Sequence, residues 1–324
     1  MFISQDGQAY KARFTGHETF HLRYGWLKKA YDAISLSNTG SDDVAAKVFR
    51  DPSAIAYFGV GKNMVASIRH WALACGIVEQ SNSNEYRSEH IATPLGDFIF
   101  HNKNGVDPYL ERLSTLWLLH WQLCTRSTKT TFLYAFNYFN ESDIEREKFL
   151  RSLKQIIETN EWGDVADATL QKDLSNLIGT YAIRKIDKRV SVEDVISSPL
   201  TELSLLSQTS ASRFRFNRGR RAGLADSVFA YCLMDFWART SPETTTLSFE
   251  AVCHNPMSPG RAFLMSSDDL MGHVSRLEQA TNGDIRWVES SGSRHIARTN
   301  IDVKPNLKWL APDYVVPDEN DRAA

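Results

Sequence analysis

The sequence has few cysteines, and none of them forms a C-x-x-C pair. Its four cysteines, Cys75, Cys124, Cys232 and Cys253, lie far apart in apolar or mixed stretches. This spacing favours reduced thiols packed in the core of a cytosolic protein over paired or reactive cysteines.

Long apolar runs are also lacking. No stretch of about 18 apolar residues occurs, and the first residues do not combine a basic segment with a long apolar one. We therefore expect neither a membrane span nor export, and we expect a soluble protein in the cytoplasm.

Charge of either sign shows no strong excess. The formal net charge is -2, so contact with nucleic acid would depend on local basic patches rather than on a general positive surface. With 42% hydrophobic and 23% charged residues, the composition is that of a globular protein. The 324 residues predict more than one domain, because single cores stop growing near about 250–300 residues.

The first third of the chain has the element order of a winged helix. Helical spacing of apolar residues occurs over 24–33, 44–49 and 62–75, and Gly76 is suited to end the third helix. Residues 77–93 then have the pattern of a β-hairpin with a polar tip. Three helices followed by a hairpin predict a winged-helix domain over residues 1–105.

In a winged helix, the helix before the wing enters the major groove. The residues expected to project outward from it and read bases or phosphates, with one from the wing, are Lys62, Asn63, Ser67, Arg69 and Arg87. The alternative is a winged helix that contacts only protein.

Residues 106–210 are predicted to form a helical middle domain. Aromatic residues are dense between 107 and 140, which usually indicates core packing. Amphipathic helices are expected over 141–161 and 167–178, so this part resembles a helical bundle that joins the two ends.

The most basic stretch lies between residues 211 and 223. It contains five arginines and no acidic residue: Arg213, Arg215, Arg218, Arg220 and Arg221. Because Arg213 and Arg215 alternate with phenylalanines, we expect an extended strand with one charged face that could hold phosphates. A solvated edge strand is the alternative.

A second helix followed by a hairpin occurs near the C-terminus. A helix is predicted over 270–280, and residues 285–288 and 294–298 form a hairpin pattern. The predicted fold is therefore mainly α with small β-hairpins, in which winged-helix domains at both ends are joined by a helical bundle. The expected divisions are 1–105, 106–210, 211–312 with the basic strand and second winged helix, and a flexible tail at 313–324.

His17-Glu18-Thr19-Phe20-His21 matches H-E-x-x-H, in which two histidines one helical turn apart bind zinc. The preceding residues 11–16 show no helical stripe, and Gly16 would weaken a helix. We therefore do not expect a zinc protease.

A nuclease would need carboxylates that hold a divalent metal, or a base and a nucleophile, close to a basic patch. The candidate catalytic residues are Glu18, Asp173, Asp194 and Asp235. Acidic residues of this kind more often serve as ion-pair or helix-cap residues, and no metal ligand is assigned. The cofactor for such a reaction would be Mg²⁺ or Mn²⁺.

Several strings along nearly the whole chain resemble those of one bacterial family of formerly unknown function. They are residues 14–20, 22–29, 59–65, 107–110, 115–121, 216–219 and 258–261. Members of this family occur beside sulfurtransferases related to phosphoadenosine-phosphosulfate reductase. The family pattern often has another residue, commonly proline, where this chain has His21. The family pattern therefore lacks the second zinc ligand of H-E-x-x-H.

The resemblance implies the nicking component of the SspABCD system, which carries out single-stranded DNA phosphorothioation in antiphage defence. The implied partners are DNA and the sulfurtransferase and ATPase subunits of a modification complex, and a homodimer is left open. The alternative is a non-enzymatic winged-helix regulator or a subunit that targets the sulfurtransferase.

Overall fold

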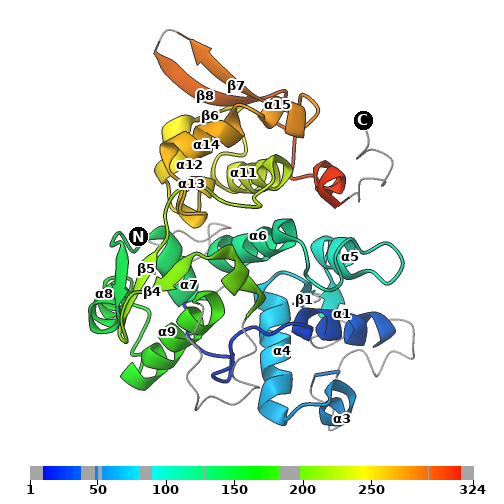
Figure 1. Cartoon of the computed structure of the whole chain (residues 1–324), viewed down its shortest axis with the longest axis vertical. Coiled ribbons are helices and arrows are strands. Elements are labelled where there is room, and N and C mark those ends of the chain that lie inside the picture. The colour runs from blue at the N-terminus through cyan, green and yellow to red at the C-terminus, as the bar shows by residue number, and fades with distance from the viewer. Residues whose placement is uncertain are drawn as a thin grey trace. The chain divides into compact units, whose positions relative to one another are not determined.

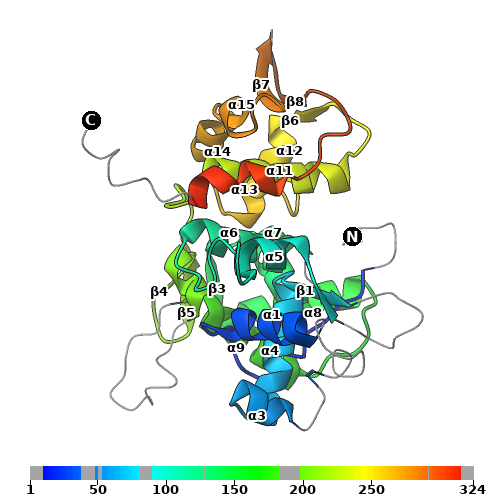
Figure 2. The ribbon, with the colours of Figure 1, turned by 90° about the vertical axis from the view of Figure 1, so that its right-hand side faces the viewer.

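The structure is a computed structural model that is mainly helical, with three small antiparallel sheets among the residues it describes. The chain divides into two compact units, residues 1–218 and 219–324 (Figures 1 and 2). The predicted fold class, mainly α with small hairpins, is confirmed at this level. The described residues are 10–37, 48–49, 53–80, 90–126, 129–182, 198–290 and 292–314.

The first unit begins with three described helices and a two-stranded sheet. The helices are α1 (Trp26–Ser37), α3 (Ala54–Phe58) and α4 (Lys62–Ala74). Strands β1 (Val78–Gln80) and β2 (His90–Ala92) pair antiparallel. The predicted first and third helices and the paired strands are present, whereas α3 lies after the segment 44–49 for which a helix was predicted. The tip of the predicted wing, with Arg87, lies outside the described residues, as does most of 44–49.

Glycines in a left-handed conformation follow helices α3 and α4. Gly59 ends α3 with a φ of 65°, and Gly76 follows α4 with the same φ, a left-handed conformation that glycine adopts without strain.

The prediction for Ser67 on helix α4 is wrong. This residue was expected to project outward, but it is fully buried because its hydroxyl donates to His17 O at 2.6 Å.

The middle of the first unit is helical, as predicted. Its helices are α5 (Pro94–Phe100), α6 (Leu113–Trp121), the π-helix η1 (Gln122–Arg126), α7 (Thr130–Asn137), α8 (Arg146–Thr159) and α9 (Asp167–Tyr181). The aromatic stretch is core: Trp117, Trp121, Phe132 and Phe136 are at most 1% exposed.

A three-stranded sheet closes the first unit, with the order β3 (Asp143–Glu145), β5 (Arg213–Phe216) and β4 (Leu206–Gln208), and the 3-10 helix η2 (Pro199–Leu203) precedes β4. The predicted strand with one charged face is confirmed, because Phe214 and Phe216 are buried while Arg213 and Arg215, which alternate with them, are exposed. The alternative of an edge strand is wrong: β5 is central.

The second unit combines short helices with a sheet of order β6-β8-β7 (Figure 1). Its elements are α11 (Asp226–Thr240), β6 (Thr246–Ser248), α12 (Phe249–His254), α13 (Pro259–Ala262), α14 (Ser267–Val274), α15 (Leu277–Ala280), β7 (Ile285–Ser290), β8 (Ser293–Arg298) and the 3-10 helices η3 (Leu307–Trp309) and η4 (Ala311–Tyr314). The predicted hairpin is confirmed, and the predicted helix over 270–280 is two helices.

Across the described residues, every helix is too short or too polar to span a lipid bilayer.

Candidate functional site

The first unit contains a cleft with a volume of about 630 Å³ whose charged lining residues are mostly cations. Its walls come from the segment that leads into α1, from α4, from the start of β1, and from the end of η1 and the residue that precedes α7. The charged residues that line it are Arg13, Arg69, Arg126, Lys129, Glu18 and Glu79. Four cations against two carboxylates give the cleft a net positive charge, although the chain as a whole is slightly acidic.

A buried cluster of charged and titratable groups lies at this cleft. Asp173 Oδ1, on α9, is 3.1 Å from His17 Nε2 and 3.4 Å from Lys129 Nζ. Lys129 Nζ is also 3.4 Å from Nε2 of His70, on α4. The side chains of Asp173, His17 and Lys129 are at most 4% exposed, so the ion pair forms away from water.

Burial and mutual contact set the charge states of this cluster. Burial by itself would raise the pKa of Asp173, but the Lys129 ammonium and the hydrogen bond from His17 lower it below its ordinary value. Burial lowers the pKa of Lys129, and the charge of Asp173 and its hydrogen bond with Lys129 oppose this shift. Burial, together with the Lys129 charge, lowers the pKa of His70 to about 2, which keeps its imidazole neutral.

Two aromatic rings also contact the Lys129 ammonium. Its Nζ lies 5.0 Å from the ring centre of Trp71 and 4.6 Å from that of Phe132. Such cation–π contacts favour the charged form of the lysine. The cluster therefore fixes an ammonium group in one position at the cleft.

The G-H-E-T segment forms a tight turn rather than a helix, so the two histidines of the H-E-x-x-H string do not lie one helical turn apart. Gly16 has a φ of 104°, and a Cβ there would lie 2.6 Å from His70 Nδ1. Glu18 and Thr19 follow with φ values of 45° and 70°. Two consecutive non-glycine residues in the left-handed region are rare and strained.

Hydrogen bonds from three elements hold the turn in place. His17 Nδ1 accepts from the Thr19 amide at 3.1 Å, so the ring hydrogen is on Nε2, which donates to Asp173. Trp71 Nε1 of α4 and Asn176 Nδ2 of α9 both donate to Phe20 O, at 3.1 and 2.8 Å. With Ser67 bonded to His17 O, the turn is fixed to both helices.

Glu18 is an exposed residue of this turn, and it lines the cleft. Its carboxylate makes no hydrogen bond or ion pair with any residue that the structure describes, although three arginines line the same cleft. The turn thus presents an uncommitted carboxylate to a cationic cavity.

The structure brings together some of the residues that the sequence singled out. Glu18, Asp173 and Arg69 all belong to the cleft or to the cluster at it. Lys62 and Asn63 are exposed at the start of α4 and do not line the cleft. Asp194 lies outside the described residues.

Asp235 is separate from the cleft, in the second unit. Its carboxylate is 3.2 Å from the guanidinium of Arg239 one turn later on α11. This placement matches the ion-pair alternative that the sequence left open.

The arginines of residues 213–221 have different environments. Arg213 pairs with Glu145 at 3.0 Å and Arg215 with Asp143 at 2.9 Å, both on strand β3. Arg221 is buried and donates to two backbone carbonyls of its own unit. Arg218 and Arg220 are exposed.

Sequence reasoning missed four residues of the cleft: Arg13, His70 as a cluster residue, Arg126 and Lys129. They are scattered over more than a hundred positions and belong to no motif. The only local signal was Gly16 next to His17, which indicates a turn.

The described residues do not fit a metal site built by the protein alone. They contain no group of three histidine, cysteine, aspartate or glutamate side chains that could hold an ion. Mg²⁺ usually takes one or two carboxylates and completes its octahedron with water and phosphate oxygens.

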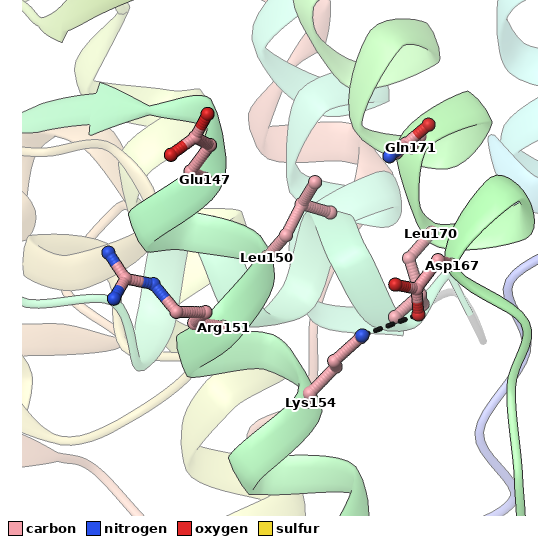
Figure 3. A pocket seen from close by; sticks show the side chains of 7 residues that line it. All are labelled: Glu147, Leu150, Arg151, Lys154, Asp167, Leu170 and Gln171. Carbon is pink, nitrogen blue, oxygen red and sulfur yellow. Dashed lines mark ion pairs between the residues drawn. The ribbon is translucent and has the colours of Figure 1, made fainter.

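A second cavity of about 360 Å³ lies between α8 and α9 (Figure 3). Its lining mixes charges of both signs, and Lys154 Nζ lies 2.5 Å from Asp167 Oδ1 across it. Arg151 lines it as well. No buried titratable group lies among its lining residues, so it lacks the features that mark the first cleft as a site.

Comparisons with known proteins match nearly the whole chain. The family described as protein of unknown function (DUF4007) matches residues 14–314. A magnesium ion-bound SspB crystal structure has a TM-score of 0.81 and 26% identity, covering 96% of this chain and 92% of that one. Another SspB crystal structure has a TM-score of 0.80 and 27% identity, and the match again covers 96% of this chain and 92% of that one. No curated protein sequence matches.

Proposed function

The chain belongs to the DUF4007 family, and from its likeness to SspB we propose that it is a component of a bacterial DNA phosphorothioation system that nicks one DNA strand. A nick would expose the phosphate at which other subunits insert sulfur. The sulfurtransferase and ATPase subunits of such a system are its proposed partners, together with DNA.

One observation carries the proposal. The cleft combines several arginines with a buried lysine and, on a strained turn, the Glu18 carboxylate, which pairs with no residue in the described part of the chain. Cations fixed in place stabilise the charge that develops on a phosphoryl group during displacement. A carboxylate among them can assist the attacking nucleophile.

We further propose that winged-helix modules hold the duplex. In the first unit, helix α4 precedes the β1–β2 pair and presents Lys62 and Asn63 at its exposed start. In the second unit, helices α14 and α15 precede hairpin β7–β8, and β6 pairs with β8 as the first strand of a winged helix does. The exposed faces of Arg213 and Arg215 would contact the sugar-phosphate backbone.

A divalent cation remains part of the proposal, because a magnesium-bound SspB structure is among the similar structures. Since the described residues offer no group of three ligands, the DNA phosphates would have to contribute to its binding. Mg²⁺ and Mn²⁺ are both suited to such oxygen ligands.

The second candidate is a non-enzymatic winged-helix subunit that targets the sulfurtransferase or regulates transcription. The observation that favours it is the same lack of a three-ligand metal group among the described residues. It predicts tight DNA binding without strand cleavage.

The test is to incubate the chain with supercoiled plasmid in Mg²⁺, in Mn²⁺ and in excess chelator, and to measure the open-circular form. Open circles that depend on the metal and are lost in Arg126→Ala support nicking in the cleft. Arg151→Ala is the matched control, because Arg151 lines the other cavity. A gel shift without open circles supports the second candidate.

A further inference from the structure

We propose that Glu18 is the catalytic carboxylate of the cleft. We further propose that the strained backbone of the G-H-E-T turn, residues 16–19, orients the Glu18 side chain toward the cleft. The inference rests on the proposed nicking activity. It assigns the reacting group, whereas the proposed function assigns only the cleft.

The first step of the argument is the backbone. Glu18 and Thr19 have φ values of 45° and 70°, and neither is asparagine or glycine, the residues that adopt this region most readily. A turn of this shape would be more stable with glycine at either position. A non-glycine residue in such a conformation persists where its side chain has a use.

The second step is the rigidity of the turn. On one side of Glu18, His17 is 3% exposed and bonded through Nε2 to the fully buried Asp173. On the other, Phe20 O accepts hydrogen bonds from Trp71 and Asn176. The backbone on both sides of Glu18 is therefore fixed. Glu18 and Thr19 are both exposed, and of these two Glu18 lines the cleft.

The third step is charge. Arg13, Arg69 and Arg126 line the same cleft, yet Glu18 pairs with no residue that the structure describes. A carboxylate placed only for stability would be expected to neutralise one of these cations. A carboxylate without an ion-pair partner among the described residues, beside a cationic surface, is instead suited to accept a proton from a nucleophile.

The reaction balances without an oxidant or reductant. A water molecule attacks phosphorus, and the new P–O bond forms as the bond to the leaving sugar oxygen breaks. The Glu18 carboxylate accepts one proton of the water, and the leaving oxygen takes a proton from solvent. The arginines bind the non-bridging phosphate oxygens.

The first experiment compares Glu18→Gln with Glu79→Gln in the plasmid assay and in a DNA-binding assay. Both variants remove one negative charge from the lining of the same cleft. We expect Glu18→Gln to lose at least about 100-fold in nicking rate, within the usual contribution of a general base, with DNA affinity unchanged or raised. Glu79→Gln should nick within a few-fold of the wild type.

The second experiment measures strain independently of activity. Glu18→Gly and Thr19→Gly both relieve a left-handed residue, and each should raise Tm by about 2–4 °C. Thr19→Gly keeps the carboxylate and should still nick, whereas Glu18→Gly should not. A fall in Tm for both variants overturns the argument from strain.

The outcomes separate the two proposals. Nicking retained by Glu18→Gln overturns the assignment of Glu18 and leaves the proposed function standing. No nicking by the wild-type chain overturns both. Equal losses in Glu18→Gln and Glu79→Gln overturn the assignment too, because they would show a general effect of charge.

Discussion

Lys129 Nζ lies 3.4 Å from Asp173 Oδ1, although Lys129 immediately precedes helix α7 and Asp173 lies within helix α9. Both side chains are almost fully buried. A buried ion pair tolerates the loss of both charges much better than the loss of one, because a single buried charge has no compensation.

Asp173→Asn should therefore destabilise the first unit by about 3–5 kcal/mol. The amide leaves the buried Lys129 ammonium without a counter-charge. The measurement is urea unfolding, with the double variant Asp173→Asn/Lys129→Met as control. A double variant less stable than the single one would contradict this account.

His70 should make stability depend on pH. Its folded pKa is about 2 and its ordinary value 6.5, so between these limits the unfolded chain binds the additional proton. Stability then falls as the pH drops below 6.5, by up to about 1.4 kcal/mol per pH unit. Unfolding midpoints from pH 7 to 4.5 should drop less in His70→Gln, and parallel curves would refute the prediction.

Arg13→Ala and Arg126→Ala should weaken DNA binding and reduce its dependence on salt. If each arginine contacts one phosphate, the slope of log affinity against log salt should decrease in magnitude by about 0.9 per variant. Fluorescence anisotropy at several salt concentrations measures this slope. Arg151→Ala, in the other cavity, should leave it unchanged.

Lys62→Ala and Arg69→Ala test the proposed recognition helix. If these side chains reach bases, each substitution should weaken binding by about 1–3 kcal/mol. The same anisotropy assay with specific and random duplexes separates base reading from phosphate contact. Unchanged affinity in both variants would argue against a recognition role for α4.

Removing the acidic partners of strand β5 should increase DNA affinity. Asp143 and Glu145 pair with Arg215 and Arg213, which reduces the charge those arginines can offer. The variant Asp143→Asn/Glu145→Gln should therefore bind DNA more tightly, and Arg213→Ala/Arg215→Ala more weakly. If the acidic substitutions leave affinity unchanged, this face does not contact DNA.

The sequence predicted elements better than it predicted the site. The start and stop of α4 were visible because Gly61 and Gly76 bound a run with helical spacing, and the alternating exposure of β5 followed from its Arg-Phe repeat. The boundaries of α4 and the alternation in β5 both depend on residues that are adjacent in the chain. Such local patterns can be recognised in a single sequence.

The cleft could not be read in the same way. Arg13, Arg126 and Asp173 meet at one site only through the tertiary packing of segments distant in the chain, and no local pattern encodes that packing. Ser67 shows the same limit. A serine on a helix is usually solvated, and only the position of His17 O explains why this one is buried.

The π-helix Gln122–Arg126 is wound more widely than the α-helix it continues, because its hydrogen bonds span five residues instead of four. Removing one residue there would rotate the helix before it by about 100° relative to the chain after it. Arg126 and Lys129, which lie at the end of this segment and just after it, would then be turned together relative to α6. The length of this segment therefore sets the direction in which two cations of the cleft face relative to α6.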